Sequence, residues 1–309
     1  MPSNAILEVN NIWKKISHHV LVNDISFNLY EGDILGFIGP NGAGKTTTMK
    51  LILGLQSTNG GTIKIAGHDI KKEFATAIKN VGAIIENPDV YMYMTGYENL
   101  KISAKIYGIK RKRIEEVIEI VGLKDKIHES VKKYSLGMRQ RLGIAIAILH
   151  KPKVLILDEP MNGLDPKGID EFKKLLLSLA KEEKMAILIS SHILSELENI
   201  CNRVCIISNG TILKDDNIKN IKEVTDKITY TIELNNTKLD NILYNYQVID
   251  NNHIKIISKK ENINTIIKTL ILNNISIYEI KKEKKSLENI FLEILKEEQR
   301  DKINHNRTN

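Results

Sequence analysis

The chain has 309 residues, 42% of them hydrophobic, and a formal net charge of +7 in which basic and acidic residues are interspersed. This length predicts two domains of ordinary size, and the modest, mixed charge singles out neither nucleic acid nor a lipid surface as a partner. Two cysteines exclude a disulfide framework, and no apolar run approaches the roughly 18–20 residues of a membrane span. If the protein works at a membrane, we expect it to dock onto another chain.

The first 220 residues alternate strand-like and helix-like segments, which predicts an α/β fold. Short apolar or β-branched runs predict strands at Ile6–Val9, Val20–Leu29, Asp33–Ile38, Gly61–Ala66, Val81–Ile85, Val154–Leu157 and Ala186–Ile189. Helical patterns follow at Lys45–Leu53, through Thr95–Leu149, and at Lys167–Ala180 and Leu194–Cys201. The last two strands are apolar throughout, as expected of strands that are buried on both faces of a parallel sheet.

A second, smaller domain is predicted beyond the asparagine- and lysine-rich stretch Asn217–Asp226. Strand-like and helical patterns there cover Ile228–Leu234, His253–Ser258, Ile263–Leu272, Ile275–Ile280 and Leu287–Leu295. We therefore expect a first domain at residues 1–220, a small α/β domain at residues 221–298, and a disordered tail at residues 299–309.

A phosphate-binding loop is the strongest signal in the sequence. Residues 39–46 fit the pattern G-x-x-x-x-G-K-[ST] between a predicted strand and a predicted helix, a context that makes an accidental glycine-rich turn a poor alternative. Glycines let the backbone N–H groups approach a phosphate, the lysine supplies positive charge, and the threonine hydroxyl can bind Mg²⁺. The nucleotide-binding residues predicted here are Gly39, Pro40, Asn41, Gly42, Ala43, Gly44, Lys45, Thr46 and Thr47.

Two carboxylates, Asp158 and Glu159, follow the apolar strand Val154–Leu157 directly. In open α/β sheets, ligands bind at the carboxyl ends of strands. Asp158 is a candidate Mg²⁺ ligand, directly or through water, and Glu159 is the candidate base that activates the attacking water. Two solvated carboxylates at a strand end would be the simpler interpretation if the phosphate-binding loop were absent.

Three further motifs resemble those of the ABC ATPase family, in the order that this family has. Tyr134–Gln140 occupies the place of its L-S-G-G-Q signature, Asn162–Asp165 resembles its D-loop, and Ser190–His192 resembles its switch histidine. The resemblance implies ATP and Mg²⁺ as cofactors, an N-terminal antiparallel β subdomain, and a helical subdomain inserted at about residues 87–150.

The same resemblance implies a head-to-tail dimer of ATPase subunits. In it, Ser135 and Gly137 of one subunit would grip the γ-phosphate bound by the other subunit, because a serine hydroxyl, a backbone N–H and a helix N-terminus all favour an anion. Lys45, Glu159 and His192 would be the catalytic residues, with His192 hydrogen-bonded to the γ-phosphate or to water. Asp165 would shape the dimer interface.

Two departures from the family pattern narrow the resemblance. Leu136 and Met138 replace a glycine and the glutamine of the signature, and Glu86 stands where the family usually has glutamine. A carboxylate can bind Mg²⁺ but cannot donate a hydrogen bond. Glu86, the signature and the ending Ser286–Leu295 resemble the ATPase subunits of bacitracin exporters and lantibiotic self-protection exporters.

The residue that stacks on adenine is not identified by the sequence. The family's aromatic residue aligns near Ile16, and Trp13 or His18 could replace it, although Trp13 could equally be a packing residue.

The function that this pattern favours is that of a transport ATPase on the cytoplasmic face of the membrane. It would attach there through a separate permease, which we expect to contact Glu86–Leu100, and it would not bind nucleic acid. Three alternatives are an exporter ATPase for another substrate, a soluble ABC-type ATPase acting on nucleic acid or ribosomes, and an unrelated P-loop enzyme such as a kinase. The signature and the histidine argue against the last.

Overall fold

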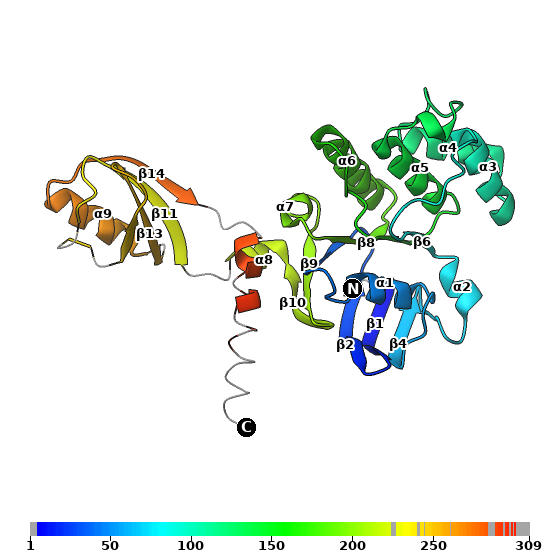
Figure 1. The fold of residues 1–309 in the computed structure, drawn as a ribbon, viewed down its shortest axis with the longest axis horizontal. Coiled ribbons are helices and arrows are strands. Elements are labelled where there is room, and N and C mark those ends of the chain that lie inside the picture. The colour runs from blue at the N-terminus through cyan, green and yellow to red at the C-terminus, as the bar shows by residue number, and fades with distance from the viewer. Residues whose placement is uncertain are drawn as a thin grey trace. The chain divides into compact units, whose positions relative to one another are not determined.

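The computed structural model describes residues 5–223, 227–239, 242–243, 245–259, 261–283, 288–292, 294–296, 298 and 300. The chain divides into two compact units, Met1–Asn217 and Ile218–Asn309 (Figure 1). The tail expected at residues 299–309 lies outside the described residues, apart from residue 300. Within the described parts of the chain, no helix combines the length and the apolar character that crossing a bilayer requires.

The first unit begins with a four-stranded antiparallel sheet in the order β2-β1-β4-β5. Its strands are β1 (Leu7–Ile16), β2 (His19–Leu29), β4 (Gly60–Ile65) and β5 (His68–Asp69). Buried and exposed positions alternate along much of β1 and β4, so one face of this sheet packs into the core.

A six-stranded sheet forms the centre of the first unit, in the order β10-β9-β3-β8-β7-β6. Its strands are β3 (Ile34–Ile38), β6 (Val81–Ile84), β7 (Val154–Leu157), β8 (Ala186–Ser191), β9 (Arg203–Ser208) and β10 (Thr211–Asn217). All are parallel except β10, which pairs antiparallel with β9. Every residue of β3, β7 and β8 is buried, because helices or the other sheet cover both faces.

The main hydrophobic core lies between these two sheets. It joins one face of β3, β7, β8 and β9 to the buried side chains of β1, β2 and β4, and the apolar residues of α1 (Lys45–Ile52) contribute to it. Phe27 of β2 and Phe37 of β3 meet edge to face there, with ring centroids 5.0 Å apart. The remaining helices of the layers are α2 (Phe74–Ile78), α6 (Pro166–Glu182) and α7 (Leu194–Leu197).

A group of helices is inserted between β6 and β7, and Figure 1 shows it in green beside the sheet edge. It contains α3 (Gly96–Tyr107), α4 (Arg111–Ile120), the 3₁₀ helix η1 (Val131–Lys133) and α5 (Leu136–Ile148). A capping box at Thr95 and Glu98 starts α3, and Gly108 ends it in the left-handed conformation. Helix α5 packs closely on β6, since a Cβ on Gly82 would lie 2.2 Å from the Ala147 carbonyl oxygen.

The second unit contains an antiparallel sheet in the order β12-β13-β11-β14. Its elements are α8 (Ile218–Glu223), β11 (Lys227–Leu234), β12 (Tyr246–Val248), β13 (His253–Lys259), α9 (Ile263–Leu272) and β14 (Ile277–Glu283). Apolar residues of β11, β13 and α9 form its own core. Residues 288–292 and 294–296 are helical, as expected.

The predicted fold class is confirmed, and the differences concern single elements. The sequence did not indicate β9, β10 or β12 as strands, and α8 lies in a stretch that was expected to be irregular. Helix α7 spans four residues and ends before Cys201, which is buried together with Cys205 of β9.

Candidate functional site

The loop between β3 and α1 is built around glycines that no other residue could replace without strain. Gly44 has a φ of +102°, and a Cβ there would lie 2.8 Å from the Leu21 carbonyl oxygen. A Cβ on Gly39 would lie 2.3 Å from the Ile207 carbonyl oxygen. Helix α1 begins directly after this loop without a side-chain cap, so its first N–H groups are available to an anion.

Lys45 is buried at the start of α1, and its ammonium group contacts the loop it follows. Nζ donates hydrogen bonds to the carbonyl oxygens of Gly39 (2.7 Å) and Pro40 (3.2 Å). It also lies 3.8 Å from Oε1 of Glu159. Burial lowers the pKa of Lys45, and the charges of Glu159 and Asp158 oppose that shift. A buried cation is thus placed between the loop and a carboxylate.

Asp158 lies at the carboxyl end of β7 and is 2% exposed. Its Oδ2 accepts a hydrogen bond from the Thr46 hydroxyl at 2.7 Å, and its Oδ1 accepts one from the Ser190 hydroxyl at 2.6 Å. Hydroxyl and carboxylate oxygens are the ligands that Mg²⁺ prefers, usually as one or two protein ligands beside water and phosphate oxygens. In the described part of the chain no three His, Cys, Asp or Glu side chains cluster into a metal cage. Thr46 and Asp158 therefore fit a magnesium ion that a phosphate helps to hold.

Glu159 follows Asp158 in an unusual backbone conformation. Its φ is +50°, in the left-handed region, which costs a residue with a side chain about 1–3 kcal/mol. Its N–H donates to the Ser190 hydroxyl at 2.9 Å. Its carboxylate contacts His192 Nδ1 and accepts a hydrogen bond from Asn162 Nδ2 at 2.9 Å. The conformation and these partners direct the carboxylate towards Lys45.

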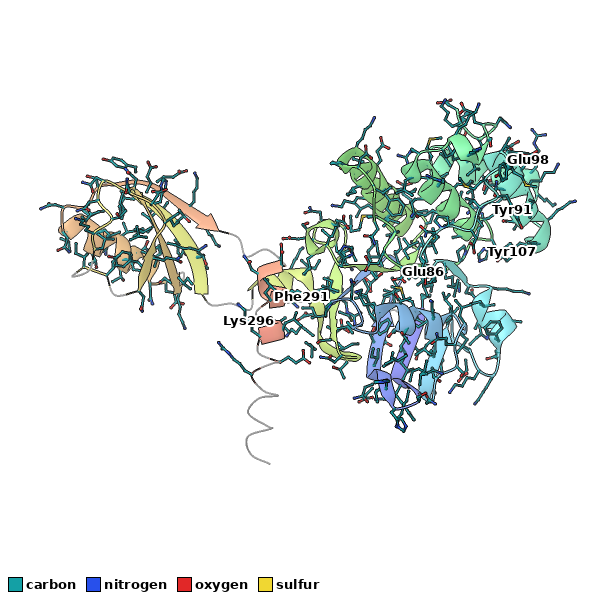
Figure 2. All side chains as sticks on the ribbon, viewed as in Figure 1. Glu86, Tyr91, Glu98, Tyr107, Phe291 and Lys296 are labelled. Atoms are coloured by element: carbon teal, nitrogen blue, oxygen red, sulfur yellow. The ribbon has the colours of Figure 1, made fainter. Side chains whose placement is uncertain are left out.

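Glu86 follows β6, the strand beside β7, and also has a positive φ, +70°. Its side chain is 69% exposed and forms an ion pair with Lys50 of α1 at 3.1 Å. Figure 2 shows Glu86 between the central sheet and the inserted helices, with Tyr91 and Tyr107 on the helical side. The ion pair with Lys50 thus holds the Glu86 side chain against α1, the helix that starts at the phosphate-binding loop.

Ser135 and Gly137 lie at a second site, at the start of α5. The Ser135 hydroxyl caps this helix by accepting a hydrogen bond from Met138 N at 3.2 Å. Both residues line a pocket of about 440 Å³, whose far wall includes Asp165 at the start of α6. The residues lining this pocket include none of the loop between β3 and α1. Within one chain, the two groups of predicted residues therefore form two sites.

Known proteins that are similar to this chain identify its family. The family described as ABC transporter matches residues 22–162. The "Uncharacterized ABC transporter ATP-binding protein YhcH" of Bacillus subtilis (strain 168) is 44% identical, over 94% of this chain and 96% of its own length. This chain belongs to the ABC transporter ATP-binding proteins.

A second sequence relative and a solved structure are also similar to this ABC ATPase. The "Bacitracin transport ATP-binding protein BcrA" of Bacillus licheniformis is 39% identical, over 94% of this chain and 98% of its own length. A solved structure described as "Structure of ATP binding subunit of ABC transporter" is 30% identical with a TM-score of 0.63, and the match covers 71% of this chain and 92% of that one.

Membership of this family confirms the predicted activity. The chain is the ATP-binding and ATP-hydrolysing subunit of an ABC transporter. The predicted resemblance to bacitracin-type ATPases is confirmed as well. The roles of single residues stay predictions.

The structure of this ABC ATPase shows the surroundings of the residues that could stack on adenine. Trp13 lies against Gly60, since a Cβ on that glycine would be 2.2 Å from the indole Nε1. This contact gives Trp13 a packing role. Ile16 is 49% exposed at the end of β1, and His18 is exposed in the turn that follows.

The sequence analysis assigned no role to three residues that organise the site, although two of them, Asn162 and Ser190, belong to its motifs. Ser190 contacts both Asp158 and Glu159, Asn162 holds the Glu159 carboxylate, and Lys50 holds Glu86. Ser190 directly follows the apolar run Ala186–Ile189, as Asp158 follows Val154–Leu157. The register that makes these two residues neighbours, with Leu157 opposite Ile189 in parallel strands, is seen only in the structure. Nothing in the sequence indicated Lys50.

Proposed function

We propose that this ABC ATPase binds Mg²⁺-ATP in the loop Gly39–Thr47 and hydrolyses it with Glu159 as the base. One observation carries the proposal: consecutive residues of one loop contact both carboxylates at the end of β7. Thr46 is hydrogen-bonded to Asp158 at 2.7 Å, and the Lys45 ammonium lies 3.8 Å from Glu159. A phosphate held by this loop would therefore lie beside both a metal ligand and a base.

Mg²⁺ would be held by Thr46 and Asp158, with Glu86 as the third protein ligand. When bound, the ion neutralises charge on the phosphate oxygens. Lys50 occupies one oxygen of the Glu86 carboxylate, Oε1. The other oxygen is the one that Glu86 could offer to the metal.

Glu159 would accept a proton from the attacking water. Asn162 and His192 both contact its Oε2, which leaves Oε1 directed to Lys45. A phosphate bound by Lys45 would therefore lie near Oε1. Lys45 would then stabilise charge that develops on the β- and γ-phosphates, because a preorganised buried cation is most effective there. His192, 46% exposed in its side chain, would also reach the γ-phosphate or the water.

Ser135 and Gly137 would complete the ATP site of a second subunit in a head-to-tail dimer. A Cβ on Gly137 would meet nothing nearer than Leu164 at 3.8 Å, which is ordinary contact. The φ of Gly137 is not positive. The fold of this chain therefore gives no reason for a glycine at this position, whereas the close approach of a nucleotide from another subunit does.

The permease would dock at Glu86–Leu100, which would place the ATPase on the cytoplasmic face of the membrane. Three large side chains of this segment, Tyr91, Tyr93 and Met94, are exposed by 60%, 87% and 39%. Clustered exposed apolar residues are typical of protein interaction sites. The capping box at Thr95 starts α3 within this segment and so fixes the backbone that follows the three side chains.

The exported substrate would be an antibiotic peptide such as bacitracin or a lantibiotic. Its support is the name of the relative from Bacillus licheniformis, together with Glu86 and the altered signature. Export of another substrate is the second candidate, and a role away from the membrane is the third.

Glu159→Gln tests the proposed chemistry, because it keeps the size of the side chain and removes the base. ATP hydrolysis should fall by about 10²–10⁴ while the Kd for ATP changes less than about two-fold. Glu119→Gln on α4, an exposed surface glutamate, is the matched control and should behave as wild type. Near-normal turnover of Glu159→Gln would refute the assignment of the base.

The same pair of variants tests the substrate class in the native host. Cells carrying Glu159→Gln in place of the wild-type gene should become several-fold more sensitive to bacitracin or to a lantibiotic, and Glu119→Gln cells should not. Unchanged sensitivity to both classes, with hydrolysis lost in vitro, would leave the ATPase assignment intact and overturn the antibiotic-peptide substrate.

A further inference from the structure

The loop after β8 carries His192, and a buried carboxylate braces it. The Ile193 N–H donates to the Ser191 hydroxyl oxygen at 2.9 Å. The Ser191 hydroxyl in turn donates to Oε2 of Glu196 at 3.0 Å. Ser191 and Glu196 are 2% and 7% exposed, so water does not compete for these bonds. His192 lies within this three-residue bracket.

This arrangement is a capping box in which a serine hydroxyl is inserted between the N-cap N–H and the glutamate. In an ordinary capping box, a glutamate in the third helical position accepts directly from the N–H of the N-cap residue. Here Ile193 is the N-cap of α7 and Glu196 is its third residue, yet the Ser191 hydroxyl stands between them. The inserted step ties the end of β8 to α7 and fixes the backbone on both sides of His192.

The strand side of the loop is fixed too. Ser190, the residue before the bracket, is fully buried and hydrogen-bonded to Asp158. His192 therefore leaves a backbone that is anchored to the metal-binding aspartate at one end and to Glu196 at the other. Its own Nδ1 contacts the Glu159 carboxylate. A small rotation of the 191–193 backbone would move the imidazole away from Glu159.

We propose that Glu196 is a positioning residue for ATP hydrolysis: acting through Ser191, it holds His192 against Glu159. The inference rests on the proposed roles of His192 and Glu159. A purely structural role as a helix cap is the simpler interpretation. Helix α7, however, is one turn long, and burying a carboxylate costs several kcal/mol unless its hydrogen bonds replace those of water. An ordinary serine N-cap would start such a helix without that cost.

Glu196→Leu and Glu196→Gln separate these interpretations. The leucine removes the acceptor, so the Ser191 hydroxyl turns to its other neighbour, the Ile193 carbonyl oxygen at 3.3 Å. The glutamine keeps an acceptor oxygen in the same place. We expect kcat to fall about ten-fold in Glu196→Leu, with KM for ATP within about two-fold, and to recover in Glu196→Gln. Glu198→Leu, at the end of α7, is the matched control and should keep the wild-type kcat.

A double-mutant cycle with His192→Ala decides whether the effect passes through the histidine. In the His192→Ala background, Glu196→Leu should cause no further loss of kcat. A second readout that does not depend on activity is the imidazole NMR signal of His192, assigned by its absence in His192→Ala. This signal should shift in Glu196→Leu and return to its wild-type position in Glu196→Gln.

Three results would overturn the inference. The first is a wild-type kcat and an unshifted His192 signal in Glu196→Leu. The second is an equal loss of kcat with and without His192, which would leave Glu196 as a helix cap only. In the third, His192→Ala hydrolyses ATP at the wild-type rate; the proposed role of His192 is then wrong, and the inference fails with it. The first two results leave the proposed function untouched.

Discussion

The Ser190 hydroxyl is shared by the two acidic residues of the site, and its removal should be costly. In the structure it donates to Asp158 Oδ1 at 2.6 Å and accepts from Glu159 N at 2.9 Å. Ser190→Ala leaves a buried carboxylate oxygen and a buried N–H without this partner. A hydrogen bond to a charged group contributes about 1.5–3 kcal/mol, and an unsatisfied buried N–H costs about 1–3 kcal/mol.

Asp158 keeps its bond to Thr46, so the two losses do not add fully. We expect Ser190→Ala to lower the free energy of unfolding of the first unit by about 3 kcal/mol. For a domain of about 200 residues, this corresponds to a fall in Tm of about 6–12 °C. Hydrolysis should fall as well, because Asp158 and Glu159 lose their common anchor.

Fluorescence of Trp13 measures this transition selectively, because it is the only tryptophan of the chain and lies in the first unit. Ser178→Ala on α6 is the matched control. Among the residues that the structure describes, its hydroxyl bonds to the Leu175 carbonyl oxygen alone, within the same helix, so we expect a change below about 0.5 kcal/mol. If Ser190→Ala lowers the free energy of unfolding by less than about 1 kcal/mol, the shared hydroxyl does not stabilise the first unit as expected.

Three other predictions have equally specific outcomes. Gly44→Ala should abolish ATP binding and lower Tm, because its Cβ would lie 2.8 Å from a carbonyl oxygen. Gly42→Ala meets no neighbouring atom and carries only the strain of a φ of +80°, so it should only weaken binding; fluorescent-ATP titration compares the two. Gly137→Ala should leave Tm and the Kd for ATP of the separate subunit unchanged, whereas the ATPase rate of the assembled transporter should fall by about ten-fold or more. Glu86→Gln breaks the ion pair with Lys50 and should change the Mg²⁺ concentration for half-maximal hydrolysis, whereas ATP affinity in EDTA should stay the same; loss of nucleotide binding in EDTA would mean a structural role for Glu86.

The central sheet was predictable because β3, β7 and the first four residues of β8 are apolar and are bounded by polar residues. The loop Gly39–Thr46 was predictable because the spacing of its glycines, lysine and threonine reflects a local backbone geometry. Strands β9 and β10 were missed. Their hydrogen bonds come from β3 and from each other, and the Arg203–Asp215 ion pair that joins them is a contact across the sheet that no local pattern reveals.

The site could be predicted as a set of residues but not as a network. Thr46, Asp158 and Glu159 were found from motifs, whereas the hydroxyl that joins the last two comes from a strand 31 residues further along the chain. The positive φ of Glu159 is likewise set by the surrounding fold, because glutamate has no intrinsic preference for that conformation. Sequence periodicity does not carry such information.

The left-handed backbone at Glu86 and Glu159 has a consequence for how this protein responds to selection. Glycine would relieve about 1–2 kcal/mol of conformational energy at each position. A library screened only for heat resistance would therefore move away from glutamate at both positions. Under the proposed role of Glu159, the members that lost this glutamate would no longer hydrolyse ATP. Stability and turnover would then oppose each other at Glu159, so a thermostable and active variant would have to be obtained by changes elsewhere in the chain.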